Sequence, residues 1–108
     1  AAVGDAAKVM VILDSNHTED HVARELEAYA DLVSVGSYCI VCDGIMADVV
    51  GAPRTQADWR TNNPITATHA FLADHPEFRL ESPAFEFNES SIVAPVTYWP
   101  QSHLMRVS

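Results

Sequence analysis

The sequence predicts an α/β domain in which a parallel β-α-β unit is followed by a helix and antiparallel strands. Two apolar runs rich in β-branched residues, at 9–14 and 37–43, each end in an aspartate and are separated by one segment with helical periodicity. The segments that suit antiparallel strands come later, beyond residue 77. A chain of 108 residues is about the size of one small domain, so we expect a single core.

The first run, "VMVILD", follows a connector at residues 1–8. It is expected to form a strand that is buried on both faces, because its apolar residues are continuous rather than alternating. A helix is predicted over residues 18–33, where apolar residues recur at helical spacing. Either Asn16 or Thr18 supplies the N-cap of this helix.

The second run, "SYCIVCD", is predicted to lie beside the first, because a strand, a helix and a strand joined by short links form one right-handed crossover. Asp14 and Asp43 then follow neighbouring parallel strands at their carboxyl edge, which is where open α/β sheets bind ligands. Cys39 and Cys42 form a C-x-x-C pair within this run. Their spacing sends two strand side chains to opposite faces, so we expect buried, unreactive thiols rather than a redox pair or half of a zinc site.

The segment at 44–63 is predicted to be a long loop, which is a candidate cover for the carboxyl edge, with Trp59 as a contact residue. A second helix is predicted to start with Asn63 as its N-cap and Pro64 at its first position, and to end before Pro76.

The remaining segments are predicted to form short antiparallel strands, at 78–82, 84–87 and within 95–108, interrupted by prolines. Trp99 is expected to belong to a packed strand. Surface positions are expected for His21, His69, His75 and His103.

The charge of the chain limits its classes of partner. Six Lys and Arg against fifteen Asp and Glu give a formal net charge of −9, which repels nucleic-acid phosphates and anionic lipid head groups. We therefore expect neither nucleic acid nor a membrane surface as a partner. No apolar run approaches the roughly 20 residues that cross a bilayer, and no secretory leader pattern opens the chain, so a cytoplasmic location is expected.

Polar residues crowd directly after the first strand, in "DSNHTEDH" at 14–21. Two interpretations of this cluster stay open. It is either a metal or catalytic site at the carboxyl edge, or the polar cap of the helix that follows a buried strand. Asp43 carries the same ambiguity, because an acid at a strand end also caps the turn that follows.

Three stretches, "VMVILDSNHTEDHVARELEAYADLVSVGSYCIVCDG", "AFLADHPEF" and "TYWPQSHLMRVS", resemble the C-terminal half of the cephalosporin hydroxylase and rhamnosyl O-methyltransferase family. The resemblance implies a Rossmann-like, class I S-adenosylmethionine-dependent methyltransferase. This chain would carry its fourth, fifth, seventh and sixth strands, contiguous in that order. The N-terminal half of such an enzyme binds the cofactor through a glycine-rich turn, and the four glycines here make no such turn. The resemblance thus implies half a sheet, which a homodimer or a complementing chain would complete at the unpaired strand 9–14.

A more distant similarity to catechol O-methyltransferase and its metal-dependent relatives implies roles for single residues. Asp14 and Asp43 match positions that hold a divalent cation such as Mg²⁺, and His17 matches the basic residue that takes the proton from the substrate hydroxyl. Cys42 stands where these relatives carry Glu or Asp, and a thiolate is a poor ligand for Mg²⁺. The resemblance assigns no cofactor-binding residue to this chain, so S-adenosylmethionine would bind only once the missing half is supplied.

Two functions of different classes follow from the resemblance. In the first, the chain is a small methyltransferase-derived domain that self-associates through strand 9–14 and does not transfer methyl groups alone. In the second, it is part of an S-adenosylmethionine-dependent, divalent-metal-assisted O-methyltransferase that acts on a hydroxylated small molecule such as a sugar. Binding of S-adenosylmethionine to the isolated chain separates the two.

Overall fold

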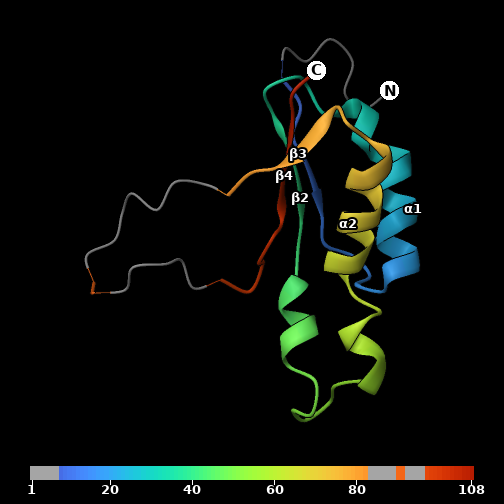
Figure 1. The fold of residues 1–108 in the computed structure, drawn as a ribbon, viewed down its shortest axis with the longest axis vertical. Coiled ribbons are helices and arrows are strands. Elements are labelled where there is room, and N and C mark those ends of the chain that lie inside the picture. The colour runs from blue at the N-terminus through green and yellow to red at the C-terminus, as the bar shows by residue number, and fades with distance from the viewer. Residues whose placement is uncertain (1–7, 83–89, 92–96) are drawn as a thin grey trace.

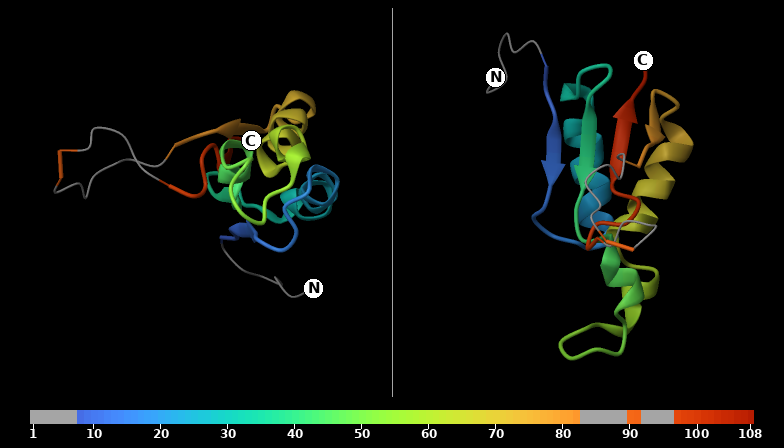
Figure 2. Two further views of the ribbon diagram at one scale, coloured as in Figure 1. Left: turned by 90° about the horizontal axis from the view of Figure 1, so that it is seen from below. Right: turned by 90° about the vertical axis from the view of Figure 1, so that its left-hand side faces the viewer.

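The computed structural model describes residues 8–82, 90–91 and 97–108, in which a four-stranded mixed sheet carries two α-helices on one face (Figure 1). β1 (Val11–Leu13) pairs in parallel with β2 (Tyr38–Val41). β4 (His103–Arg106) runs antiparallel to both β2 and β3 (Phe78–Leu80). The order β1-β2-β4-β3 confirms the predicted α/β class and strand order, and it places β1 at one edge of the sheet (Figure 2).

The predicted first helix is observed as α1 (Glu19–Tyr29), which a 3₁₀ turn, η1 (Ala30–Leu32), extends. Thr18 occupies the N-cap position, but its side chain makes no capping hydrogen bond. The Glu19 N–H donates instead to Asn62 Oδ1 at 2.7 Å. The start of α1 is therefore fixed by a side chain from the segment that leads into the second helix.

The second helix, α2 (Pro64–Asp74), begins and ends as predicted. Asn63 is the N-cap, Pro64 takes the first helical position, and Asn63 Oδ1 accepts a hydrogen bond from the Thr66 N–H at 3.1 Å. The Thr66 side chain completes a capping box with the backbone N–H of Asn63. α2 packs beside α1. The core lies between this helical layer and the sheet, and its buried residues are Leu13, Val22, Leu26, Ala30, Val33, Cys39, Val41, Ala67, Phe71, Phe78 and Leu104.

The prediction that the first strand is buried on both faces is wrong for the described residues. Leu13 is buried in the core, but Ile12 is 55% exposed and Met10 is 53% exposed. The reason is that both helices pack on the same face of the sheet, as the side view shows (Figure 2), and no described element covers the other face. A continuous apolar run indicates two buried faces only where two layers are present.

The expectation that Trp99 belongs to a packed strand is also wrong. Trp99 lies in a turn before β4 and is 41% exposed. Pro100 follows it and has no N–H to donate to a strand ladder, and Gln101 adopts a left-handed conformation with φ of 52°. Because of both features, β4 begins only at His103.

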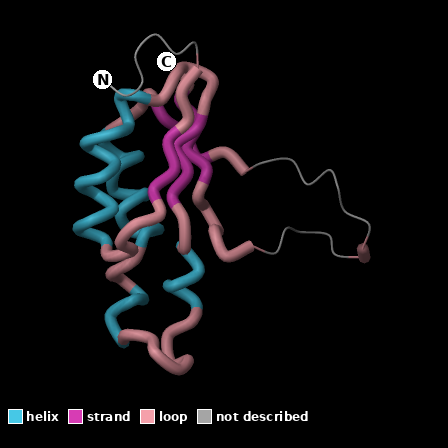
Figure 3. The backbone as a smooth tube through the Cα atoms, turned by 180° about the vertical axis from the view of Figure 1, so that it is seen from behind, coloured by secondary structure: helices cyan, strands magenta, loops and turns pink. Residues whose placement is uncertain are grey.

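The segment at 44–63 contains two short 3₁₀ helices, η2 (Gly44–Asp48) and η3 (Ala57–Arg60), which extend beyond the carboxyl end of β2 (Figure 3). Trp59 in η3 is half-buried, and its carbonyl accepts a hydrogen bond from Asn63 Nδ2 at 2.7 Å. The connector predicted at 1–8, apart from its last residue, and the strand predicted at 84–87 lie outside the described residues. Among the described residues, no helix has the length and apolar character that a membrane crossing requires.

Candidate active site at the carboxyl edge of the sheet

The register of β1 and β2 brings their two terminal acids to the same edge. Leu13 pairs with Val41, and the ladder continues by one bond, from the Cys42 N–H to the Leu13 carbonyl at 3.1 Å. Asp14 therefore lies opposite Cys42, and Asp43 follows one residue later. This is the arrangement that the sequence predicted from two apolar runs that both end in aspartate.

Asp43 reaches the site through an unusual backbone conformation. Its φ of 58° and ψ of 29° are left-handed, a region that aspartate tolerates better than most residues with a side chain. The chain turns here from β2 into η2. The turn gives the carboxylate of Asp43 a different direction from the one that a continuing strand would give it.

His17 lies on the loop between β1 and α1, where Asn16 Oδ1 accepts a hydrogen bond from the Thr18 N–H at 3.0 Å. Its Nε2 atom is 2.8 Å from Asp43 Oδ2, and both side chains are about one third exposed, at 28% and 35%. An imidazole and a carboxylate at this distance form a hydrogen bond in either charge state of the histidine. The structure thus joins the loop after β1 to the end of β2.

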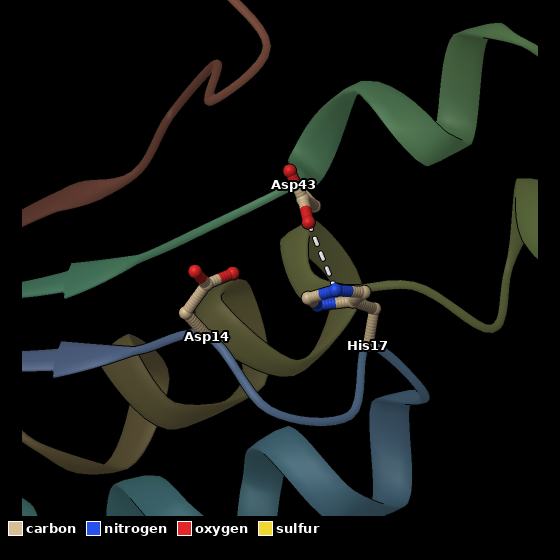
Figure 4. Close-up of side chains that lie close together, drawn as sticks. All are labelled: Asp14, His17 and Asp43. Carbon is tan, nitrogen blue, oxygen red and sulfur yellow. Dashed lines mark ion pairs between the residues drawn. The ribbon is translucent and has the colours of Figure 1, made fainter.

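Asp14 completes the cluster, because its carboxylate oxygen lies within 4.8 Å of ligand atoms of both His17 and Asp43 (Figure 4). Opposite ligands of one ion, each about 2.1 Å from it, would be about 4.2 Å apart, so the three side chains need little movement to share a cation. Asp14 is exposed, which leaves this side open to a substrate and to water. The structure therefore brings together all three residues that the sequence analysis had singled out.

Cys42 is adjacent to this cluster but has the character of a buried thiol. Its pKa is raised to about 11, mainly by burial and to a smaller extent by the negative charges of Asp14 and Asp43. A neutral thiol at physiological pH is not a cation ligand, because it is the thiolate that coordinates metals. The predicted buried state of Cys39 and Cys42 is confirmed, and both thiols are free.

A second polar cluster lies on the other side of Asp14. His21 and Glu25, one turn apart on α1, approach to 2.5 Å between Nε2 and Oε1, and Ser15 Oγ donates to the same Glu25 oxygen. Ser15 Oγ is also 3.0 Å from His21 Nε2. Because serine and glutamate meet the same imidazole nitrogen, this is not the relay geometry of a nucleophilic triad, which uses both ring nitrogens.

The sequence analysis missed this second cluster and expected only a surface position for His21, whose side chain is 38% exposed. The four-residue spacing of His21 and Glu25, which places them on one helix face, was the available indication. Asn62, which binds the start of α1, was also missed, and no local pattern marks a partner that is 43 residues away.

Comparison with known proteins gives one match. The family model described as rhamnosyl O-methyltransferase/CmcI matches residues 1–107 of the 108-residue chain. No curated protein and no solved structure matches the chain.

Proposed function

Because the chain belongs to the rhamnosyl O-methyltransferase/CmcI family, we propose that it forms the metal- and acceptor-binding part of an S-adenosylmethionine-dependent O-methyltransferase. The acceptor is a hydroxylated small molecule such as a sugar. The observation that carries the proposal is the convergence of Asp14, His17 and Asp43 within 4.8 Å at the carboxyl edge of the sheet. Helix capping alone does not require this convergence, since none of the three side chains caps α1.

In this proposal Asp14 and Asp43 hold a divalent cation such as Mg²⁺. Two carboxylates are a sufficient protein contribution for this ion, which commonly keeps several water or substrate oxygens in its shell. The cation would supply positive charge that lowers the pKa of an acceptor hydroxyl. Asp43 can serve two partners at once, because Oδ2 bonds His17 and a carboxylate has a second oxygen that can bind a cation.

His17 is the general base of the proposal. If its Nε2–H donates to Asp43, the Nδ1 lone pair is left to accept a proton, and the carboxylate fixes the ring and its tautomer. The acceptor hydroxyl gives its proton to His17. S-adenosylmethionine, held by the cofactor-binding half, would supply the methyl group that the acceptor oxygen takes up.

Methyl transfer in this proposal needs a cofactor-binding half in addition to these 108 residues, because their four glycines are too widely spaced in the sequence to form a glycine-rich turn. β1 offers the place for it. Its outer edge is unpaired among the described strands, and Met10 and Ile12 are more than half exposed beside it. A segment of the same protein or a complementing chain that carries the cofactor-binding half would pair there.

The same edge supports a second candidate function, a self-associating domain without methyl transfer. An exposed apolar strand edge favours pairing with another strand whether or not the result is an enzyme. Light scattering of the isolated chain tests this candidate, because a well-folded monomer at micromolar concentration would refute self-association through β1. Clear binding of S-adenosylmethionine to the isolated chain would refute the need for a second half.

Calorimetric titration with Mg²⁺ and Mn²⁺ tests the metal site. We expect one ion per chain for the wild type and a loss of at least about tenfold in affinity for both Asp14→Asn and Asp43→Asn, because each removes one of two charged ligands. Asp48→Asn is the matched control, since Asp48 is an exposed acid on the neighbouring η2. Equal affinity in all four proteins would overturn the assignment of the two ligands.

The variant His17→Gln tests whether His17 acts as a general base or as a ligand of the cation. The variant is expected to keep most of the affinity for the cation, because His17 is not a ligand in the proposal. Once the cofactor half is supplied, it is expected to lose about 10²–10⁴-fold in turnover, the usual contribution of a general base. Loss of cation affinity in His17→Gln, with turnover restored at saturating Mg²⁺, would instead make His17 a ligand.

A further inference from the structure

The segment between β2 and α2 begins and ends against the same short stretch of chain. At its start, Asp43 Oδ2 lies 2.8 Å from His17 Nε2. At its end, Asn62 Oδ1 accepts a hydrogen bond from the Glu19 N–H at 2.7 Å. Between these two points the chain runs out beyond the carboxyl end of β2 and returns (Figure 3). Both ends of the segment therefore contact residues 17–19, which join the loop after β1 to the start of α1.

The loop at 14–18, which carries His17, is fixed at both of its ends. At the first end it continues a strand that is paired with β2. At the other end Thr18 occupies the N-cap position of α1 without a side-chain capping bond, and Asn62 supplies an acceptor in its place. His17 is two residues from Glu19, so the position of the Glu19 N–H limits where the imidazole can lie.

The side-chain amide of Asn62 is fixed in one orientation. Its Nδ2 donates to Asp58 Oδ2 at 3.0 Å, and its backbone N–H donates to the Asp58 carbonyl at 2.7 Å. A flipped amide would set two donors against each other at Glu19 and two acceptors against each other at Asp58. Asp58 belongs to η3, so this 3₁₀ helix directs the Asn62 oxygen towards α1.

Asn62 acts on the first turn of α1 rather than on the packing of the whole helix. Val22 and Leu26 hold α1 in the core and are 3% and 0% exposed. The next residue, Asn63, caps α2 instead, because its Oδ1 accepts from the Thr66 N–H. Loss of the Asn62 side chain is therefore expected to leave both helices packed and to release the start of α1 alone.

We propose that Asn62 is a positioning residue, which holds residues 17–19 so that the His17 imidazole meets Asp43. It acts through the backbone of Glu19 and not on the reacting atoms. A general base contributes only while its nitrogen lies within hydrogen-bond reach of the hydroxyl proton, so a displaced loop lowers turnover. The inference rests on the proposed function only in taking His17 as the base. The placement of the imidazole is testable without the cation or S-adenosylmethionine.

The test compares the wild type with Asn62→Ala by NMR on the ¹³C,¹⁵N-labelled chain, with EDTA present. Loss of one neutral hydrogen bond changes an equilibrium about fivefold, so exchange of the Glu19 amide with water is expected to speed up at least about fivefold. The nuclear Overhauser contact between the His17 ring and the Asp43 side chain is expected to weaken at least about twofold. The Thr66 amide is the internal reference, because it belongs to the cap of α2, and its exchange rate is expected to stay unchanged.

A double variant that exchanges the two polar partners supplies the rescue. Asn62→Asp combined with Asp58→Asn keeps an acceptor for the Glu19 N–H and restores the bond between positions 58 and 62 with its direction reversed. Exchange of the Glu19 amide in this variant is expected to return to within about twofold of the wild-type rate. A double variant that behaves as Asn62→Ala does would overturn the proposal.

The proposal would also be overturned by an undiminished His17–Asp43 contact in Asn62→Ala, or by equal acceleration of the Glu19 and Thr66 amides. Once the cofactor half is supplied, Asn62→Ala is expected to lose at least about fivefold in kcat while its affinity for Mg²⁺ stays at the wild-type value. A general loss of structure would lower both. A weakened contact with unchanged kcat would support the placement of the imidazole by Asn62 and would refute its role as the base.

Discussion

Asn63→Ala is expected to be among the most destabilising single substitutions outside the apolar core, because one side chain at this position makes two separate capping contacts. Asn63 Oδ1 accepts from the Thr66 N–H at 3.1 Å, and Asn63 Nδ2 donates to the Trp59 carbonyl at 2.7 Å. The residue is only 1% exposed, so water cannot easily replace either bond after truncation.

The magnitude follows from these two bonds. Loss of an N-cap side chain costs about 0.5–2 kcal/mol, and loss of a further buried hydrogen bond costs about 1 kcal/mol. We therefore expect Asn63→Ala to lower the free energy of unfolding by about 1.5–3 kcal/mol. With a denaturant slope of about 1–3 kcal/mol/M in urea, the midpoint of unfolding falls by about 0.5–3 M. Circular dichroism measures the helices, and tryptophan fluorescence reports on Trp59 beside the η3–α2 junction and on Trp99 before β4. Coincident unfolding curves justify a two-state analysis.

Asn63→Asp is the matched control. It keeps the acceptor for the Thr66 N–H and adds a negative charge at the N-terminus of α2, which contributes about 0.3–1 kcal/mol of stability. It loses the donor to the Trp59 carbonyl. The net loss is expected to be about 1 kcal/mol or less. If Asn63→Ala stays within about 0.5 kcal/mol of the wild type, or if Asn63→Asp is as unstable as Asn63→Ala, the capping argument fails.

Gly44→Ala is expected to lower the free energy of unfolding by about 1–3 kcal/mol through overpacking, because the added Cβ would lie 2.8 Å from the Pro100 carbonyl oxygen and 2.9 Å from Ile65 Cγ1. An unchanged midpoint of urea unfolding would contradict this close approach. The two thiols give a pH prediction, since burial raises the pKa of Cys42 to about 11 and that of Cys39 to about 12, from an ordinary value of 9.0. The folded state then holds both thiol protons more tightly than the unfolded chain does. The two thiols therefore favour the folded state fully below pH 9.0, and this stabilisation is lost as the pH rises towards 11 and 12, because the thiols of the unfolded chain ionise first. The midpoint of thermal unfolding should therefore fall between about pH 9 and pH 11, with a flatter profile for Cys39→Ala, and a profile that is equally steep in that variant would assign the fall to other groups. A shift of about two pH units also reduces the thiolate fraction of native Cys42 about 100-fold, so at about pH 8 a thiol reagent should modify the unfolded chain much faster than the native protein.

The elements that the sequence predicted well are those whose causes are local. Asn63 followed by Pro64 specifies a helix start through a side-chain acceptor and a preset φ, and α2 begins there. The two apolar runs before Asp14 and Asp43 specify neighbouring strands, and β1 and β2 are parallel neighbours. The candidate site followed from these local features, because parallel strands end at a common edge.

The features that the sequence did not predict depend on distant partners or on missing layers. The start of α1 is bound by Asn62, 43 residues away from Glu19. The exposure of Ile12 depends on which layers pack on the sheet, which the strand's own residues do not determine. Trp99 has the β propensity of a strand residue, but the backbone of the next two residues excludes it from β4.

The proposed site depends on one backbone feature that no side-chain pattern reveals. By register alone the partner of Asp14 would be Cys42, a buried neutral thiol, and the edge would hold a single carboxylate. The left-handed conformation of Asp43 turns the chain directly after Cys42, so that a second carboxylate comes within 2.8 Å of His17 and close to Asp14. An L-residue in this region costs about 1–2 kcal/mol, and aspartate is among the few that visit it routinely. Aspartate at position 43 therefore meets two separate requirements: it tolerates the left-handed backbone, and it brings a negative charge to the site.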